Sequence, residues 1–190
     1  MWLIFTRRSI DIKKYPAIHE HLKQFKTQLE PEPEDWDEKK KDKWPGRKPG
    51  SYKWYEIQDN IAYWQEFEQP KIVIPAITSD VEYAADNEKH FSNDKTSIWV
   101  TSELNYLLGL LNSKALWWLI RQTAASKQGG FYEFKPMYVS TLPISAASPE
   151  KQQAVERLVD RILAAKQRDA EADVSALELE TTSWSMRSTA

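Results

Sequence analysis

Apolar residues recur at helical spacing near the start of the chain, in residues 15–29. They fall at Ile18, Leu22, Phe25 and Leu29, and Pro16 precedes them. Positions three or four residues apart share one face of an α-helix, and proline suits the first helical turn. The spacing therefore predicts an amphipathic helix over residues 15–29, and similar spacing predicts a short helix over residues 56–67.

Short apolar runs predict strands in the middle of the chain. The first covers residues 71–77, in which Pro75 indicates an edge strand or a bulge, and the second covers residues 97–100. A glycine pair at residues 129–130 indicates a turn, and the FYEF run at 131–134 predicts a further strand.

Two later segments carry strong helical patterns. Ser102 suits a helix N-cap, and leucines at helical spacing follow it as far as residue 119. Pro149 suits the first turn of a second helix, predicted over residues 149–168, which packs on the domain or on a partner. Its apolar positions are Val155, Leu158, Val159, Ile162 and Leu163.

These elements predict an α+β fold, with short strands in mixed sheets, several helices and a C-terminal helix. A length of 190 residues suits one ordinary domain with an appendage. We expect the domain over residues 1–146, a helical appendage over 147–180, and a disordered or frameshifted tail over 181–190.

Residue usage excludes several chemistries. The absence of cysteine excludes thiol catalysis, disulfides, zinc ribbons and iron–sulfur ligation, and the five glycines form no dinucleotide or P-loop motif. His19 and His21 are two positions apart and face opposite sides of a helix, and His90 has no partner at ligand spacing, so we expect no metal site. Serine lacks the G-x-S-x-G elbow of many hydrolases. The apolar start before Arg7 is too short for a signal or a membrane span, so we expect a cytoplasmic protein without membrane contact.

Charge is unevenly distributed in a polar, proline-rich segment, residues 31–52, which we interpret as a long ordered loop. Residues 30–38 hold six acidic side chains, whereas residues 39–53 hold seven cations and one anion. Lys43, Arg47, Lys48 and Lys53 can neutralise phosphates or reach base edges, and Tyr52 can add a stacking or phosphate contact. The alternative is a loop whose aromatic rings pin it to the core while its cations stay in solvent.

The acidic part of this segment also contains a nuclease-like pattern, Glu38-x-Lys40. A nuclease needs its carboxylates fixed on adjoining strands to hold Mg²⁺. No strand is predicted there, so we interpret the pattern as solvated charge.

Four blocks of sequence carry a resemblance to a known family. They are TRRSIDIKKYPAIHEHLKQFK, GSYKWYEIQDNIAYWQEFEQPKIVIPAI, YLLGLLNSKALWWL and GGFYEFKPMYVSTLPI, in this order. Together they resemble the TaqI-type C-terminal specificity domain of type IIG restriction–modification enzymes, over residues 2–146. The segment 149–168 also resembles the helix that follows the domain in that family.

The resemblance implies a target recognition domain that reads the major groove of DNA. Relatives carry an upstream adenine-specific methyltransferase domain, and often a nuclease domain. This chain lacks the methyltransferase's Asn/Asp-Pro-Pro-Tyr/Phe motif, so we expect no catalytic residue and no cofactor in it, with S-adenosylmethionine and Mg²⁺ confined to the missing catalytic domains. The resemblance favours the DNA-facing interpretation of the cationic loop and adds Lys127 and Gln128, in a second loop where relatives approach DNA.

The expected partners are double-stranded DNA and the methyltransferase domain of the parent enzyme. The leading function is therefore sequence-specific recognition of double-stranded DNA, as the specificity domain of a type II restriction enzyme or adenine-specific methyltransferase. The alternative is an interaction or structural remnant that associates, with itself or a partner, through the helix at 149–168. An autonomous nuclease using Glu38 and Lys40 is the least favoured.

The C-terminus departs from the family after Glu180. Relatives continue with a helix resembling Ile-Asp-x-Leu-Val-Tyr-x-Leu-Tyr-Gly, where this chain has TTSWSMRSTA. Joining the third base of each codon to the next two can give Asn-Asp-Gln-Leu-Val-Tyr-Ala-Leu-Tyr-Gly. We therefore hypothesise a frameshift near residue 180, which makes Trp184 accidental; codons incompatible with the shifted peptide would exclude it. Of the other tryptophans, we expect Trp2, Trp54, Trp64, Trp99 and at least one of Trp117 and Trp118 in the core.

Overall fold

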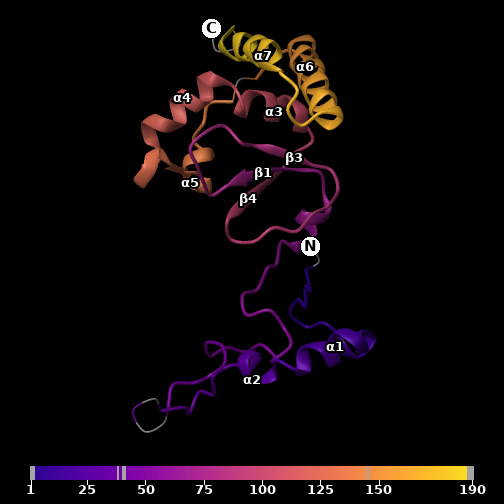
Figure 1. The fold of residues 1–190 in the computed structure, drawn as a ribbon, viewed down its shortest axis with the longest axis vertical. Helices are drawn as coiled ribbons and strands as arrows, with labels where there is room; N and C mark the ends of the chain where they lie inside the picture. The colour runs from indigo at the N-terminus through magenta and orange to yellow at the C-terminus, as the bar shows by residue number, and fades with distance from the viewer. Residues whose placement is uncertain (1–2, 38, 40–41, 145, 188–190) are drawn as a thin grey trace. The chain divides into compact units, whose positions relative to one another are not determined.

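The computed structural model describes residues 3–37, 39, 42–144 and 146–187, and these form two compact units. Unit 1 is Met1–Trp64 and unit 2 is Gln65–Ala190 (Figure 1). The division differs from the expected one, which placed the boundaries at residues 146 and 180. Trp2, Glu38 and Lys40, which the sequence singled out, lie outside the described residues.

Unit 1 has few regular elements. They are the 3₁₀ turn η1 (Ile12–Lys14) and the helices α1 (Pro16–Lys23) and α2 (Lys26–Leu29). The single helix expected over residues 15–29 is thus two short ones, because Phe25 leaves helical geometry at φ −111° and ψ 12°. No side chain of either helix is buried, so tertiary packing does little to extend them.

The prediction of a helix over residues 56–67 is wrong. Its place is taken by irregular chain and the 3₁₀ turn η2 (Trp64–Glu68) at the junction of the units. The Ile57 N–H donates to the Thr6 carbonyl at 2.8 Å, a bond to a distant segment that replaces a helical one.

Unit 2 contains two small antiparallel sheets. In the larger, β1 (Lys71–Pro75) lies between β3 (Ala84–Asp86) and β4 (Thr96–Val100). The smaller pairs β2 (Ile77–Thr78) with β5 (Tyr132–Glu133). β1 is central, but β3 reaches only as far as Val73, so at Pro75 the strand has β4 as a neighbour on one side only and the proline is tolerated at a local edge.

The single helix expected from Ser102 to residue 119 is interrupted in the structure. It divides into α3 (Leu104–Leu111) and α4 (Lys114–Thr123). Ser113 begins α4 by accepting a hydrogen bond from the Leu116 N–H, so the chain turns there. The remaining elements are η3 (Gln128–Gly130), α5 (Pro136–Val139), α6 (Pro149–Arg168) and α7 (Ser175–Arg187). The α+β fold class is confirmed.

The core of unit 2 lies between the larger sheet and α3, and α6 and α7 cover the far side of α3 (Figure 1). Ile72 and Ile74 of β1 meet a run of leucines from α3. A Cβ on Gly109 would lie 2.8 Å from both Val155 and Val159, so glycine permits the close approach of α3 and α6.

The C-terminal helices belong to this core. Val155, Leu158 and Val159 of α6 are buried within the chain, so the apolar face that we expected to serve association is already covered. Residues 181–187, where we expected disorder, continue α7, and Trp184 packs against the core. Residues 188–190 lie outside the described residues.

The adjacent tryptophans of α4 divide as expected. Trp117 stacks on Phe134 with 5.6 Å between ring centroids, whereas Trp118 is 64% exposed. None of the helices in the described part of the chain has the length and apolar character needed to cross a membrane.

Candidate nucleic-acid interface

Arg47 closes the cationic loop of unit 1 from within. Its Nε donates to the Leu29 carbonyl at 2.7 Å and its Nη1 to the Glu56 carbonyl at 2.8 Å. Its Nη2 donates to the Trp54 carbonyl at 2.9 Å, with a longer contact of 3.5 Å to Lys53. Burial lowers the pKa of Arg47, but arginine stays charged at neutral pH. One planar guanidinium thus ties together three chain segments, which a single ammonium could not do.

Tyr52 forms the centre of this loop. Its side chain is 5% exposed, and its hydroxyl donates to the Lys48 carbonyl. The guanidinium carbons of Arg8 and Arg47 lie 4.9 and 4.5 Å from its ring centroid. Arg8 also donates to the Gln58 carbonyl. Cations over an aromatic ring are attracted to its negative face, so Tyr52 holds two arginines in place.

A buried carboxylate fixes the end of the loop. Glu56 is 5% exposed and accepts hydrogen bonds from the backbone N–H groups of Lys53, at 3.0 Å, and Ser9, at 3.1 Å. The second bond ties residue 9, which has a positive φ of 61°, to the loop. Among the described residues, the buried Nε of Arg8 has no hydrogen-bond partner, so one donor of this inner cluster stays unpaired.

The beginning of the loop is held by tryptophans. Trp44 donates from Nε1 to the Glu30 carbonyl at 3.0 Å, and its ring meets that of Trp36 at 4.8 Å. A Cβ on Gly46 would lie 2.2 Å from the Glu30 carbonyl oxygen, so only glycine fits this crossing. Pro31 and Arg47 form an isolated bridge, which brings the acidic part of the loop alongside the cationic part.

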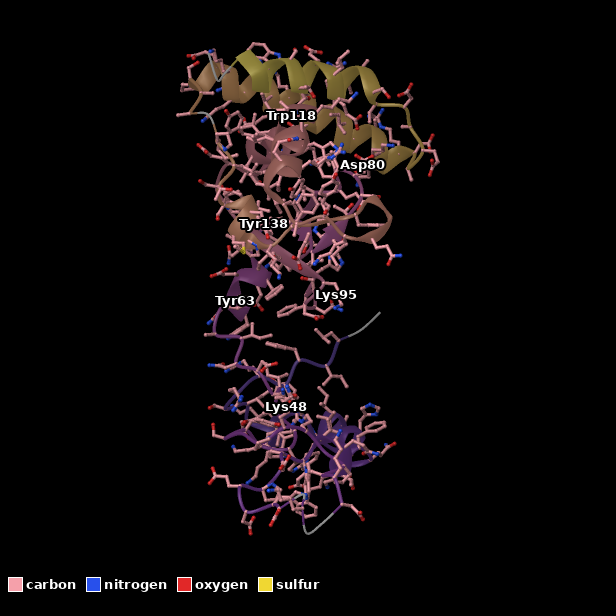
Figure 2. The ribbon with its side chains drawn as sticks, turned by 90° about the vertical axis from the view of Figure 1, so that its left-hand side faces the viewer. Lys48, Tyr63, Asp80, Lys95, Trp118 and Tyr138 are labelled. Carbon is pink, nitrogen blue, oxygen red and sulfur yellow. The ribbon has the colours of Figure 1, made fainter. Side chains whose placement is uncertain are left out.

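Three lysines of the loop have side chains that are exposed to solvent. They are Lys43, Lys48 and Lys53, of which Figure 2 labels Lys48. Lys53 lies 5.7 Å above the Tyr55 ring and 3.8 Å from Glu56, and a hydrogen bond with Tyr55 raises its pKa. The lysines are therefore charged groups on a loop whose backbone is fixed from beneath.

An aromatic cluster next to the loop was missed by the sequence analysis. The ring centroid of His19 in α1 lies 5.4 Å from that of Trp54 and 6.0 Å from that of Tyr55. The Nζ of Lys26 lies 5.8 Å from the Trp54 ring centroid. Trp54 was expected in the core, and the sequence gives no sign that α1 would meet it.

The second predicted loop belongs to unit 2. Lys127 and Gln128 are exposed beside Gly129 and Gly130, which have φ values of +82° and +81°. The Lys127 N–H donates to the Phe131 carbonyl at 2.7 Å, closing a tight turn. Lys127 also lies 3.5 Å from Glu133, which partly offsets its charge.

The structure therefore sorts the seven predicted site residues. Arg47 and Tyr52 are engaged inside unit 1, whereas Lys43, Lys48 and Lys53 are exposed on its surface, Lys53 within 3.8 Å of Glu56. Lys127 and Gln128 form a separate exposed turn in unit 2. Over the described ranges, no group of three or more His, Cys, Asp or Glu side chains is placed to hold a metal ion.

Comparison with known proteins identifies one family. Residues 9–144 match the model of the TaqI-like C-terminal specificity domain. The match covers the cationic loop of unit 1 and the glycine turn of unit 2, while α6 and α7 follow it. No curated protein matches the chain.

Proposed function

Because the chain belongs to the TaqI-like C-terminal specificity domain family, we propose that it recognises a particular sequence of double-stranded DNA. A specificity domain of this family serves restriction–modification enzymes by selecting the DNA site, and it is non-catalytic. The finer assignment, an adenine-specific methyltransferase or type II endonuclease as the parent enzyme, is part of this proposal. S-adenosylmethionine and Mg²⁺ would then be held by the catalytic domains and not by this chain.

The observation that carries the proposal is the outward display of Lys43, Lys48 and Lys53 on an internally fixed loop. Such lysines suit phosphates, which position a protein on DNA without reading its sequence. A loop already ordered by Arg47 and Tyr52 loses little conformational entropy when DNA binds. Unit 1 also carries a net positive charge, in contrast to unit 2.

We assign Arg47 and Tyr52 a supporting role in this interface. Their polar groups already bond to backbone carbonyls, and turning them to DNA would leave those carbonyls unpaired. Lys127 and Gln128 are the proposed second contact. Gln128 carries an amide of the kind that can pair with an adenine edge, and its glycine neighbours allow close approach.

The test is a titration of labelled random-sequence duplex over a range of salt concentrations. The parent chain is compared with a Lys43→Ala, Lys48→Ala, Lys53→Ala variant. A control carries Lys95→Ala, Lys151→Ala and Lys166→Ala, which changes the net charge equally at exposed sites of unit 2. Loss of three phosphate contacts should reduce the magnitude of the negative slope of log K, the association constant, against log salt concentration by roughly 2 to 3. The control should keep the slope of the parent chain.

Two results would contradict the proposal. Equal binding by the loop variant and the control would remove the assigned site. Absence of binding by the parent at low salt would instead favour the interaction or structural remnant.

A further inference from the structure

Arg121 of α4 is an exposed arginine whose guanidinium lies against two aromatic rings of unit 2. Its guanidinium carbon is 5.6 Å from the ring centroid of Trp117 and 5.1 Å from that of Tyr132. The two ring planes are inclined by 80°, with 5.8 Å between their centroids. Because each ring attracts the cation, two nearly perpendicular rings restrict the orientation of the guanidinium more than a single ring would.

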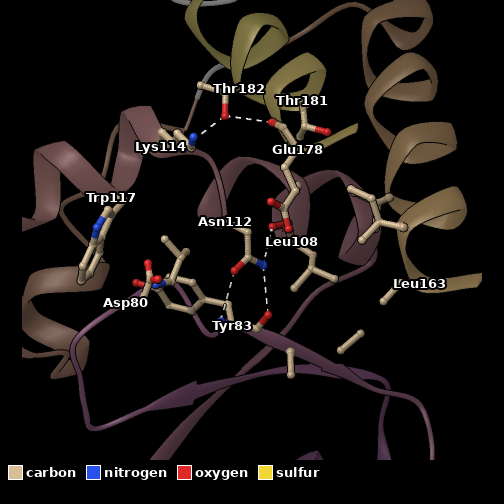
Figure 3. Close-up of a pocket in the computed structure, with 16 residues that line it drawn as sticks. Asp80, Tyr83, Leu108, Asn112, Lys114, Trp117, Leu163, Glu178, Thr181 and Thr182 are labelled. Atoms are coloured by element: carbon tan, nitrogen blue, oxygen red, sulfur yellow. Dashed lines mark hydrogen bonds between the residues drawn. The ribbon is translucent and has the colours of Figure 1, made fainter. Parts of the chain in front are cut away.

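Both rings are fixed by the fold. Trp117 stacks on Phe134, which is 1% exposed, at an interplanar angle of 24°. Figure 3 shows Trp117 on α4 among the residues that line a pocket, and neither Arg121 nor Tyr132 belongs to that lining. Tyr132 is held in β5, where it pairs with Thr78 of β2. The guanidinium therefore lies outside the pocket, on rings that the core and a sheet hold in place.

The hydrogen-bond donors of Arg121 are unused. In the part of the chain that the structure describes, its side chain makes no hydrogen bond and no ion pair. Arg47 is the opposite case, because its donors are taken by backbone carbonyls. An arginine carries its N–H donors in a planar fork, so Arg121 combines a restricted orientation with a fork that is open to a ligand.

Arg121 lies beside the glycine turn that we propose as the second DNA contact. Tyr132, whose ring it contacts, forms an isolated bridge with Ser126, at the base of this turn. Lys127 and Gln128 follow Ser126 directly and are exposed. The guanidinium therefore belongs to the same part of the surface as these two residues.

The nearest acidic residue of the turn does not neutralise Arg121. Glu133 follows Tyr132 on β5, and successive side chains of a strand point to opposite faces. Its carboxylate lies 3.5 Å from the Lys127 Nζ and 3.1 Å from the Lys135 Nζ. Glu133 is thus engaged by two lysines, and the charge of Arg121 is left for a partner.

The fixed fork of Arg121 suits a base edge better than a phosphate. A phosphate can be bound by a cation without a defined plane, as lysine does. Guanine presents its O6 and N7 acceptors side by side in the plane of the base, at the spacing of an arginine fork. A guanidinium that is already oriented loses little conformational entropy when it meets such an edge.

We propose that Arg121 reads a guanine of the DNA target, by donating hydrogen bonds to its O6 and N7 atoms. Trp117 and Tyr132 act as positioning residues for the guanidinium. The inference rests on the proposed function, and it adds the base that is read and the residue that reads it.

The first test is selection from a random duplex library by the parent chain, by Arg121→Ala and by Arg161→Ala. Arg161 is the matched control, because it is an exposed arginine of α6 and lies outside the family match. The parent and the control should enrich the same motif, which contains a G·C pair. Arg121→Ala should lose the preference for guanine at one position and keep the preferences at the others.

The second test removes one acceptor from the DNA. The guanine at that position is replaced by 7-deazaguanine, which lacks the N7 acceptor, and binding of both duplexes is titrated. The parent should bind the modified duplex at least about fivefold less tightly. Arg121→Ala should bind the two duplexes equally. A residue that only stabilised the fold, or only contacted a phosphate, would not give this difference.

The possible failures are distinguishable. If the parent enriches a motif that Arg121→Ala also enriches unchanged, this inference is overturned and sequence recognition stands. Evenly weaker binding of all duplexes by Arg121→Ala, with the motif unchanged, would show a phosphate contact and also overturn it. A parent motif without a G·C pair, or equal binding of the modified duplex by the parent, does the same. Absence of any motif from the parent overturns the proposed function together with this inference.

Discussion

Replacing Arg47 by alanine should loosen the cationic loop more than replacing any exposed lysine beside it. The change removes three hydrogen bonds of 2.7 to 2.9 Å to the carbonyls of Leu29, Glu56 and Trp54. It also removes a cation stacked 4.5 Å from the Tyr52 ring centroid.

The magnitude follows from these contacts. Each bond should contribute about 1 kcal/mol, since the released carbonyls can partly reach water, and the stacking adds about 1 kcal/mol. We therefore expect Arg47→Ala to lower the free energy of opening the loop by about 3 to 4 kcal/mol. Arg47→Lys should retain one of the bonds at most and lose about 2 kcal/mol.

Native-state hydrogen exchange measures this opening directly. The reporting amides are those of Glu32, Arg47 and Glu56, which bond to backbone carbonyls within the loop. In Arg47→Ala, protection at residues 32 and 56 should fall by roughly a hundredfold or more, down to the limit set by complete exchange. Lys48→Ala is the control, because its side chain is exposed and Tyr52 bonds only to its carbonyl. Protection in Arg47→Ala within threefold of the control would refute the supporting role of Arg47.

Three further variants test other parts of the fold. Gly46→Ala should lower the free energy of unfolding of unit 1 by about 2 kcal/mol, because its Cβ would lie 2.2 Å from the Glu30 carbonyl oxygen. Urea titrations followed by tryptophan fluorescence measure this change. An unchanged midpoint would contradict the close approach of residues 46 and 30. Gly129→Ala should cost about 1 kcal/mol in the same assay for unit 2, because φ is +82°, and a neutral effect would argue against that turn. Hydrogen bonds from Lys71 and His90 outweigh burial and lower the pKa of Asp86 from 3.8 to about 2, so about 2 kcal/mol of stability present above pH 5 should be lost as the pH falls to 2. A Lys71→Met, Asp86→Asn variant should lack this part of the acid dependence, and identical pH profiles would disprove the assignment.

The sequence predicted elements well where the signal is local. The helix at 149–168 has a proline at its first turn and a complete apolar face, and α6 has those same bounds. The run at 71–77 contains β1, and the run at 97–100 covers β4 except for its first residue, because continuous apolar stretches bounded by polar residues suit strands. The resemblance expected over residues 2–146 is confirmed by the family match over 9–144.

Distant contacts account for what the sequence could not predict. Asn112 lies at the break between α3 and α4, and its amide bonds to Tyr83, 29 positions earlier in the chain. Nothing near Lys71 indicates that its charge would be fully buried on β1, because its partner Asp86 comes from the neighbouring strand at 2.5 Å. Neither pairing has a signature in the spacing of apolar residues.

The candidate site shows the same limit. Composition placed Arg47 among the DNA contacts because a cation between aromatic rings suits phosphate or guanine equally well. The carbonyls of Leu29, Trp54 and Glu56 occupy its donors instead, and only the folded loop brings those carbonyls together. The sequence identifies the lysines as solvent-facing cations. It does not show that Arg47 and Tyr52 hold the loop that carries them.

The central claim is that this chain selects a DNA sequence, and selection from a random duplex library tests it most directly. The 190-residue chain is incubated with the library at low salt, bound DNA is recovered and amplified over several rounds, and the enriched duplex competes against its shuffled counterpart. The account predicts a recurring motif that binds at least tenfold more tightly than the shuffled duplex. Recovery without a motif, or equal competition by the shuffled duplex, would contradict sequence-specific recognition by this chain.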